Sequence, residues 1–307
     1  MISPVLNIFL NVCPLCDSNK FKRFARISTS QGSLEYLQCK KCGLVFQSPQ
    51  MDEITQQEFY ATNYRSFVFG QSEPPLVDVD IQNKRAKHLV SLLKPYAGQL
   101  HGKVHVDIGC GLGILDKEIQ LTFGTLSIGI EPDNIYRQYA MTHQNLPVYS
   151  NLEDWKESTN DLASLITISH VLEHLPDPIK YLSLIRTSML SKDGYLLLEV
   201  PNLLFHYSFE LAHTYAFSPH TLREILKRSG YVILFQKKHG IPLRSTPRYI
   251  TIIAQPDQGS LTNPCDVIPE LPGVHGRRVL GLFISRVEDI LYRVSYFLKL
   301  FMKRIRI

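Results

Sequence analysis

The chain has 307 residues, of which 44% are hydrophobic and 20% charged, and its net charge is +5. This composition suits one large globular domain with appendages, or two domains. The charge is uneven, because residues 276–307 hold eight Lys or Arg residues against two acids and leave a net charge of −1 on the rest. That balance argues against a nucleic-acid-binding surface on the body of the protein. The apolar residues 1–12 lack a basic start and a cleavage site, and no apolar run reaches about 20 residues, so we expect neither a secretory signal nor a membrane-spanning helix.

Four of the six cysteines form two C-x-x-C pairs, Cys13 with Cys16 and Cys39 with Cys42. Each pair can present two thiolates from one tight turn, and two such turns complete a tetrahedral zinc site. With short strands expected at 24–27 and 34–38, residues 1–47 are predicted to form a zinc ribbon around a structural Zn²⁺. The alternatives are disulfides or a redox C-x-x-C. Without a secretion signal, reduced thiolates and a cytoplasmic location are favoured.

Residues 48–100 are predicted to be a connector that ends in a helix over 78–94. Its aromatic residues near 59–67 either pack against the ribbon or form a lid over a ligand. From residue 104 onward strands and helices alternate. The expected strands are 104–108, 126–130, 148–149, 163–169, 195–200, 231–236 and 248–254. The expected helices are 112–122, 133–144, 178–190 and 219–228. This order predicts an α/β fold over residues 101–256, with a doubly wound, mostly parallel seven-stranded sheet that ends in an antiparallel hairpin.

A glycine turn follows the first of these strands. Asp107 lies near the strand end, and Gly109, Gly111 and Gly113 come at alternate positions before a helix. Such a turn lets a ligand contact bare backbone at a helix N-terminus. Glu131 follows the next strand, close to the spacing at which nucleotide-binding folds place an acid for a ribose. The alternative is a tight turn that binds no ligand. Three alternating glycines argue against it, because packing alone does not require so many.

The pattern D-x-G-x-G-x-G resembles motif I of the class I S-adenosylmethionine (SAM) methyltransferases. Two further segments resemble a large subgroup of these enzymes that acts on small molecules, quinones and sugars. They are H-x-L-E-H-x-x-D-P at 170–178, and H-x-x-x-F-S-x-x-x-L at 213–222. The resemblance implies a Rossmann-like fold, with the acid and glycines at the amino-acid end of SAM and Glu131 at the ribose. The implied cofactor-binding residues are Asp107, Gly109, Cys110, Gly111, Gly113, Glu131, Pro132, Asn151, Leu152, Ser169 and His170.

Methyl transfer to a hydroxyl or an acidic carbon needs a base. His174 and His213 are the candidate catalytic residues, since both follow strands that end at the expected cleft and imidazole titrates near neutral pH. The alternative is that Glu173 and His174 only form a turn and a helix start. His206, Tyr207 and Tyr215 are expected to lie near His213.

A ribbon before a methyltransferase domain resembles enzymes that modify nucleotide-linked sugars or surface polysaccharides. We therefore expect a SAM-dependent methyltransferase acting on a hydroxyl or carbon of a small, sugar-like acceptor, in polysaccharide or glycolipid biosynthesis. The sugar C-methyltransferases with such ribbons usually carry a further large C-terminal domain, for which residues 257–307 are too few, so we expect O-methylation at least as much as C-methylation. Two alternatives remain, an rRNA or tRNA methyltransferase whose zinc module binds RNA, and a membrane-associated scaffold without activity.

Residues 257–307 are predicted to form a proline-rich loop and a basic amphipathic helix. Apolar residues recur at steps of three and four from 280 to 301, and basic residues occupy the other side. Over residues 277–307 this helix either packs on its own domain or a partner subunit, or lies on an anionic membrane surface. The second option would place the protein at the inner face of the membrane. A nucleic-acid contact is less favoured, and the oligomeric state is left open.

Overall fold

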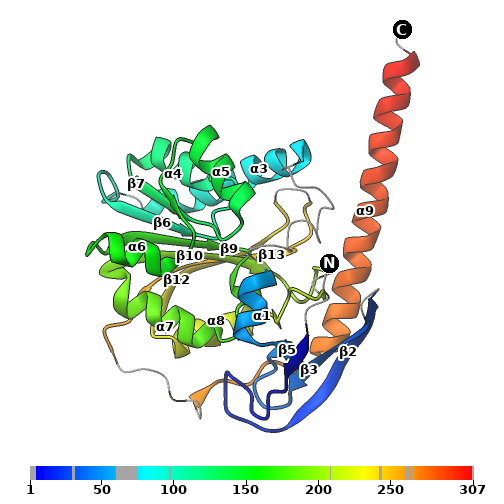
Figure 1. The fold of residues 1–307 in the computed structure, drawn as a ribbon. Coiled ribbons are helices and arrows are strands. Elements are labelled where there is room, and N and C mark those ends of the chain that lie inside the picture. Colours follow the sequence, from blue (N-terminus) through cyan, green and yellow to red (C-terminus); the bar gives the residue numbers. More distant parts are fainter. Residues whose placement is uncertain are drawn as a thin grey trace.

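The structure is a computed structural model that describes residues 5–29, 32–59, 75–96, 98–207, 209–241, 244–259, 263 and 266–305. Most of the aromatic segment near 59–67 lies outside these residues. The elements described below follow the labels of Figure 1.

A seven-stranded sheet forms the centre of the protein, in the order β12-β13-β10-β9-β6-β7-β8. The strands β10, β9, β6, β7 and β8 are parallel, and β13 runs antiparallel to both β10 and β12. Their bounds are β6 (Val104–Ile108), β7 (Leu126–Ile130), β8 (Val148–Tyr149), β9 (Ala163–Ser169), β10 (Leu190–Pro201), β12 (Tyr231–His239) and β13 (Tyr249–Pro256). The predicted fold class and the closing hairpin are therefore confirmed.

Helices cover both faces of this sheet, as Figure 1 shows, with α3, α4 and α5 on one side and α6, α7 and α8 on the other. Their bounds are α3 (Leu76–Leu93), α4 (Ile114–Phe123), α5 (Asn134–His143), α6 (Leu152–Ser158), α7 (Pro178–Ser188) and α8 (Pro219–Arg228). A short 3-10 helix, η2 (Lys94–Tyr96), follows α3. Burial on both faces explains the apolar run Leu196–Leu198 of β10, whose side chains enter hydrophobic clusters on both sides of the sheet. Because the chain turns back between β6 and β9, the carboxyl ends of these two strands flank the crevice where α/β folds bind ligands.

The ribbon is an antiparallel sheet that the rest of the protein completes. It contains β2 (Phe21–Thr29), β3 (Gly32–Cys39) and β4 (Val45–Gln47), and its fourth strand is β11 (Tyr215–Ala216), which pairs with β4. The small strands β1 (Leu6–Ile8) and β5 (Gln50–Met51) pair beside it. The two expected ribbon strands are confirmed and longer than predicted.

Three short elements differ from the sequence expectation. No helix was expected between the strands at 148–149 and 163–169, but α6 begins at Leu152, where the Asn151 side chain accepts a hydrogen bond from the Asp154 amide. The connector contains α1 (Glu53–Glu58), which Asp52 caps. The segment after β9 forms a 3-10 turn, η3 (Leu172–His174).

The C-terminal region forms one helix of 32 residues, α9 (Val274–Ile305). In Figure 1 it rises from the ribbon, passes the edge of the sheet domain and extends beyond it. The amphipathic helix predicted from the sequence is thus present. Within the described part of the chain, no helix is both long enough and apolar enough to cross a membrane.

Candidate active site

The turn after β6 keeps its backbone in conformations that suit glycine. Gly109, Gly111 and Gly113 have φ of +74°, +56° and +68°, in the left-handed region. A Cβ on Gly109 would collide with the Val171 side chain. The amides of Gly109 and Cys110 both donate to the Ile130 carbonyl oxygen, which ties the turn to the end of β7. The turn therefore exposes backbone at the crevice and leads directly into α4.

Glu131, just after β7, is buried and fixed beside this turn. Its Oε2 accepts a hydrogen bond from the Gly111 amide at 2.8 Å, and its Oε1 accepts one from the Asp133 amide at 3.0 Å. The carboxylate is thus held by backbone amides from both sides. A carboxylate in this position suits the two hydroxyls of a ribose.

Two buried carboxyl groups lie beneath the turn. Asp107 Oδ1 accepts a hydrogen bond from Thr167 Oγ1 at 2.6 Å, and Asp116 in the first turn of α4 is fully buried. Burial raises the pKa of Asp107 to about 7. Burial and the nearby Asp107 raise the pKa of Asp116 well above its usual value. Because two such neighbours resist double ionisation, Asp116 holds its proton while Asp107 titrates near neutrality. Sequence reasoning missed Asp116, whose signal is a lone acid in the apolar start of a helix.

A cavity of about 1030 Å³ joins this turn to the segment after β9. Ten of the eleven predicted cofactor residues line it: Asp107, Gly109, Cys110, Gly111, Glu131, Pro132, Asn151, Leu152, Ser169 and His170. Gly113 is not among its lining residues, and a Cβ there would meet Ala140 and Leu146. The cavity also reaches residues that the sequence did not single out: Gln56, Arg85, Lys180 and Tyr181.

His174 lines the same cavity as the glycine turn. It is buried, and its Nδ1 lies 2.9 Å from the Ala212 carbonyl oxygen, which assigns the proton to Nδ1 and the lone pair to Nε2. The ring of His213 packs against it, with 4.8 Å between centroids. His213 itself does not line the cavity, and its Nε2 pairs with Glu210 Oε1 at 3.0 Å. The structure therefore brings His174 to the cavity and places His213 behind it.

Glu173 lies beside His174 and His170. Its Oε1 lies 3.4 Å from His170 Nδ1 and 4.0 Å from His174 Nε2. Burial acts to raise the pKa of Glu173, but His170, His174 and His213 together outweigh it and hold the pKa at about 2. Burial lowers the pKa of His174 to about 4. An anionic carboxylate thus faces a neutral imidazole. Ligand-type atoms of Glu173, His174 and His213 lie within 4.8 Å of one another, a donor set that divalent transition metals also accept.

His170 stands between two buried acids and is conformationally strained. Its φ is +58°, unusual for a residue with a side chain. Its Nε2 lies 3.2 Å from Glu199 Oε1, and its amide donates to the Glu199 carbonyl oxygen. Glu199 also pairs with Arg85 at 2.9 Å and with His239 at 3.1 Å. This network, which sequence reasoning missed, fixes His170 at the end of β9.

The family of the chain follows from comparison with known proteins. Residues 81–236, about half of the chain, match a family model described as a methyltransferase domain. The chain belongs to this methyltransferase-domain family. The matched segment of the methyltransferase domain contains the glycine turn, Glu131 and the His170–His174 segment.

Curated relatives of the methyltransferase domain are similar over a shorter stretch. Ubiquinone biosynthesis O-methyltransferase from Vibrio vulnificus is 35% identical over 89 residues, which is 27% of this chain and 37% of the relative. The enzyme of that name from Aeromonas salmonicida is 32% identical over 96 residues, 30% of this chain and 40% of the relative. The chain therefore spans well under half the length of the curated relatives it matches.

Among solved structures, the chain resembles 1,6-didemethyltoxoflavin-N1-methyltransferase from Burkholderia thailandensis, solved with bound 1,6-didemethyltoxoflavin and S-adenosylhomocysteine. The TM-score is 0.53 at 14% identity, over 76% of this chain and 98% of that chain. This similarity concerns the fold. In this chain the positive-φ glycines, the amide-held Glu131 and the buried Asp107 meet at one cavity, and these features fit SAM.

The four ribbon cysteines also form a site that fits a metal. Their Sγ atoms all lie within 4.8 Å of one another, and the pairs Cys13–Cys42 and Cys16–Cys39 are each 3.5 Å apart. All four side chains are buried. A tetrahedral zinc with Zn–S bonds of about 2.3 Å needs sulfurs at this kind of spacing. The predicted Cys₄ cluster is thus present and compatible with zinc.

Proposed function

We propose that the protein is a SAM-dependent methyltransferase that methylates a hydroxyl of a small acceptor. The observation that carries the proposal is the single cavity that joins the glycine turn and Glu131 to His170 and His174. The curated relatives are named O-methyltransferases, which favours oxygen over carbon. Their names refer to ubiquinone biosynthesis and give no support to the polysaccharide expectation. We therefore propose a ring-sized acceptor, phenolic or sugar-like, without assigning a pathway.

The proposed cofactor contacts follow the lining of the cavity. Bound SAM supplies an electrophilic methyl group on its sulfonium. Asp107 and the glycine turn bind its amino-acid end, and Glu131 binds the ribose hydroxyls. The other predicted cofactor-binding residues that line the cavity contact SAM near its adenine or near its sulfonium: Cys110, Pro132, Asn151, Leu152, Ser169 and His170.

His174 and the residues behind it act on the acceptor. His174 Nε2 would accept a hydrogen bond from the acceptor hydroxyl and take its proton as the methyl group passes from the sulfonium sulfur to that oxygen, which leaves S-adenosylhomocysteine. A weak base suffices at that point, because the oxygen becomes strongly acidic once it gains the methyl group. Glu173, whose Oε1 lies 4.0 Å from Nε2, stabilises the imidazolium that results, while His213 packs on the ring and holds it in place.

We also propose that the ribbon holds a structural zinc and that the protein works in the cytoplasm. Four thiolates occupy every position of a tetrahedral ion and leave none for a substrate. A reducing compartment keeps such thiolates available to the metal.

Gly111→Arg tests the proposal. Calorimetry on the metal-loaded wild-type protein should show SAM and S-adenosylhomocysteine binding, and the variant should lose both, because the new side chain fills the turn that Glu131 holds. Gly98→Arg is the matched control, since a Cβ at Gly98 would meet nothing within 4 Å. A panel of phenols and sugars with methyl-labelled SAM then identifies the acceptor class. A wild-type protein that binds neither ligand would overturn the proposal.

A further inference from the structure

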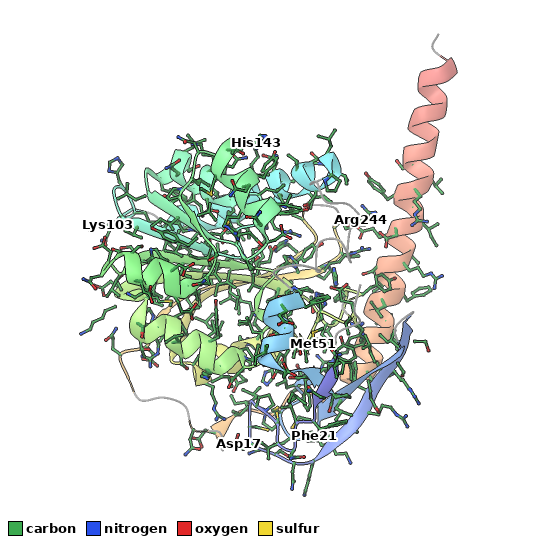
Figure 2. The ribbon with its side chains drawn as sticks, in the orientation of Figure 1. Asp17, Phe21, Met51, Lys103, His143 and Arg244 are labelled. Carbon is green, nitrogen blue, oxygen red and sulfur yellow. The ribbon has the colours of Figure 1, made fainter. Side chains whose placement is uncertain are left out.

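Up to Ser295, where its side chains are described, the helix α9 contacts the rest of the protein along one face. The Arg278 guanidinium donates to the carbonyl oxygens of Leu203 and His206, and Ser285 Oγ donates to the Phe205 carbonyl oxygen at 2.9 Å. One turn further, Asp289 pairs with Arg244 at 2.7 Å and with Arg248 at 2.9 Å. Figure 2 shows Arg244 in the space between the sheet domain and α9. These contacts fix how the helix is rotated about its own axis.

A row of large apolar side chains occupies the opposite face. At 100° per residue, positions 280, 283, 287, 291 and 294 fall on the side away from 278, 285 and 289. All five are exposed, from 40% for Val287 to 63% for Phe283 and Leu291. Their neighbours Val279, Ile284 and Ile290 are exposed as well. A continuous apolar face of this size marks an interaction site.

The charges around this face are all of one sign. Arg286 and Arg293 are exposed along one edge of it, and neither forms a salt bridge with any described residue. The two acids of the helix point the other way, since Asp289 pairs with two arginines and Glu288 accepts hydrogen bonds from Ser245 and Thr246. Beyond Asp289 the sequence adds further basic residues and no acid. The outer side of α9 is therefore apolar and cationic.

We propose that this outer face docks on an anionic lipid surface. The helix lies in the plane of the interface, with Phe283 and Leu291 at the acyl boundary and Arg286 and Arg293 at the phosphates of the headgroups. Charge favours this occupant over a second copy of the chain. Paired helices are stabilised by salt bridges between residues along their edges. Two copies of α9 would instead bring arginine edges together without an acid to pair with them.

Co-sedimentation of the full-length protein with vesicles tests the proposal. Wild-type protein should bind vesicles that contain phosphatidylglycerol and bind pure phosphatidylcholine vesicles far more weakly, and added salt should reduce the binding. Arg286→Glu/Arg293→Glu should lower the affinity about thirty-fold or more. Phe283→Asp/Leu291→Asp should lower it comparably. Lys192→Glu/Arg223→Glu makes the same change in net charge elsewhere on the surface and should retain the wild-type affinity.

Three outcomes would overturn the proposal. Wild-type protein could remain in solution with anionic vesicles, or both α9 variants could bind as the wild type does. Alternatively, Phe283→Asp/Leu291→Asp could convert a dimer to a monomer in light scattering and leave vesicle binding unchanged, which would assign the face to a second copy. SAM binding by calorimetry, measured on every variant, reports that the methyltransferase domain is folded and is independent of the vesicle result.

Discussion

Asp107 couples the charge of the cofactor turn to pH. Its carboxyl group is buried at the end of β6, where burial raises its pKa to about 7. Asp116 beneath it keeps its proton, so the pair carries at most one negative charge near neutral pH. The amino-acid end of SAM is cationic at its ammonium and sulfonium groups. In the proposed site, we therefore expect the ionised form of Asp107 to be the form that favours SAM binding.

We predict that SAM affinity rises with pH until Asp107 is ionised. Below about pH 7 binding must expel one proton from Asp107, so the affinity should fall about tenfold for each pH unit. Above about pH 7.5 it should level off. Calorimetry across this range measures the effect, and Asp107→Asn should bind more weakly and lose the pH dependence.

The stability of the cofactor-free protein should follow the opposite trend. The folded-state pKa of Asp107 lies above the unfolded value near 3.9, so the folded chain holds this proton more tightly. The stabilisation is complete below about pH 4 and is lost as the pH rises through 7. Melting temperatures without SAM should therefore fall over the range in which affinity rises. If both quantities rise together and Asp107→Asn changes neither, another group controls binding.

Elements with a strong local pattern could be predicted from the sequence. The bounds of β6, β7 and β9 match their predicted ranges, because apolar residues recur in each strand up to its last residues and a turn follows at once. The glycine turn was predictable for a similar reason, since positive φ selects glycine at fixed positions. Elements without such a pattern were missed. The helix α6 has seven residues and buries only Leu152 and Trp155, too few to show a helical period.

The other features that the sequence did not predict depend on contacts between segments that lie far apart in the chain. The strand β11 has two residues, and its partners Val45 and Phe46 lie in the ribbon. In the site, Arg85 comes from α3 and Glu199 from β10, and only the fold brings them to His170. The motif at 170–178 identified His170 and His174, but the sequence did not separate the cavity-lining His174 from His213 behind it.

The helix α8, which leads away from the His213 segment, should depend on its capping box. The Ser218 hydroxyl accepts a hydrogen bond from the Thr221 amide at 3.1 Å, and Thr221 Oγ1 accepts one from the Ser218 amide at 2.9 Å. Ser218→Ala should lower the free energy of unfolding by about 1–2 kcal/mol, because a buried amide loses its partner. Urea unfolding should show a lower midpoint with an unchanged slope. Ser188→Ala, at an exposed helix end, is the control, and an equal loss there would contradict the capping argument.

At the scale of the whole molecule, the ribbon and the methyltransferase domain share one hydrophobic core. The four cysteines, Leu15 and Phe46 belong to the same buried cluster as the inner side chains of β9 and β10. The Tyr36 hydroxyl of the ribbon donates to the carbonyl oxygens of Glu210 and His213, and Arg228 of α8 donates to the Leu15 carbonyl oxygen. The ribbon therefore supports the backbone on which His213 stands.

Loss of the ribbon metal should accordingly loosen the active-site segment as well as the ribbon. Wild-type protein and the control Cys265→Ser, outside the two cysteine pairs, should each hold one zinc per chain, and Cys16→Ser should lose it. The melting temperature of Cys16→Ser should fall by about 10 °C, since a zinc site is worth several kcal/mol. Hydrogen exchange should then quicken both in residues 13–47 and in residues 209–217, because β11 loses its partner strand. Faster exchange in the ribbon alone would show that the His213 segment is held by the methyltransferase domain without the ribbon.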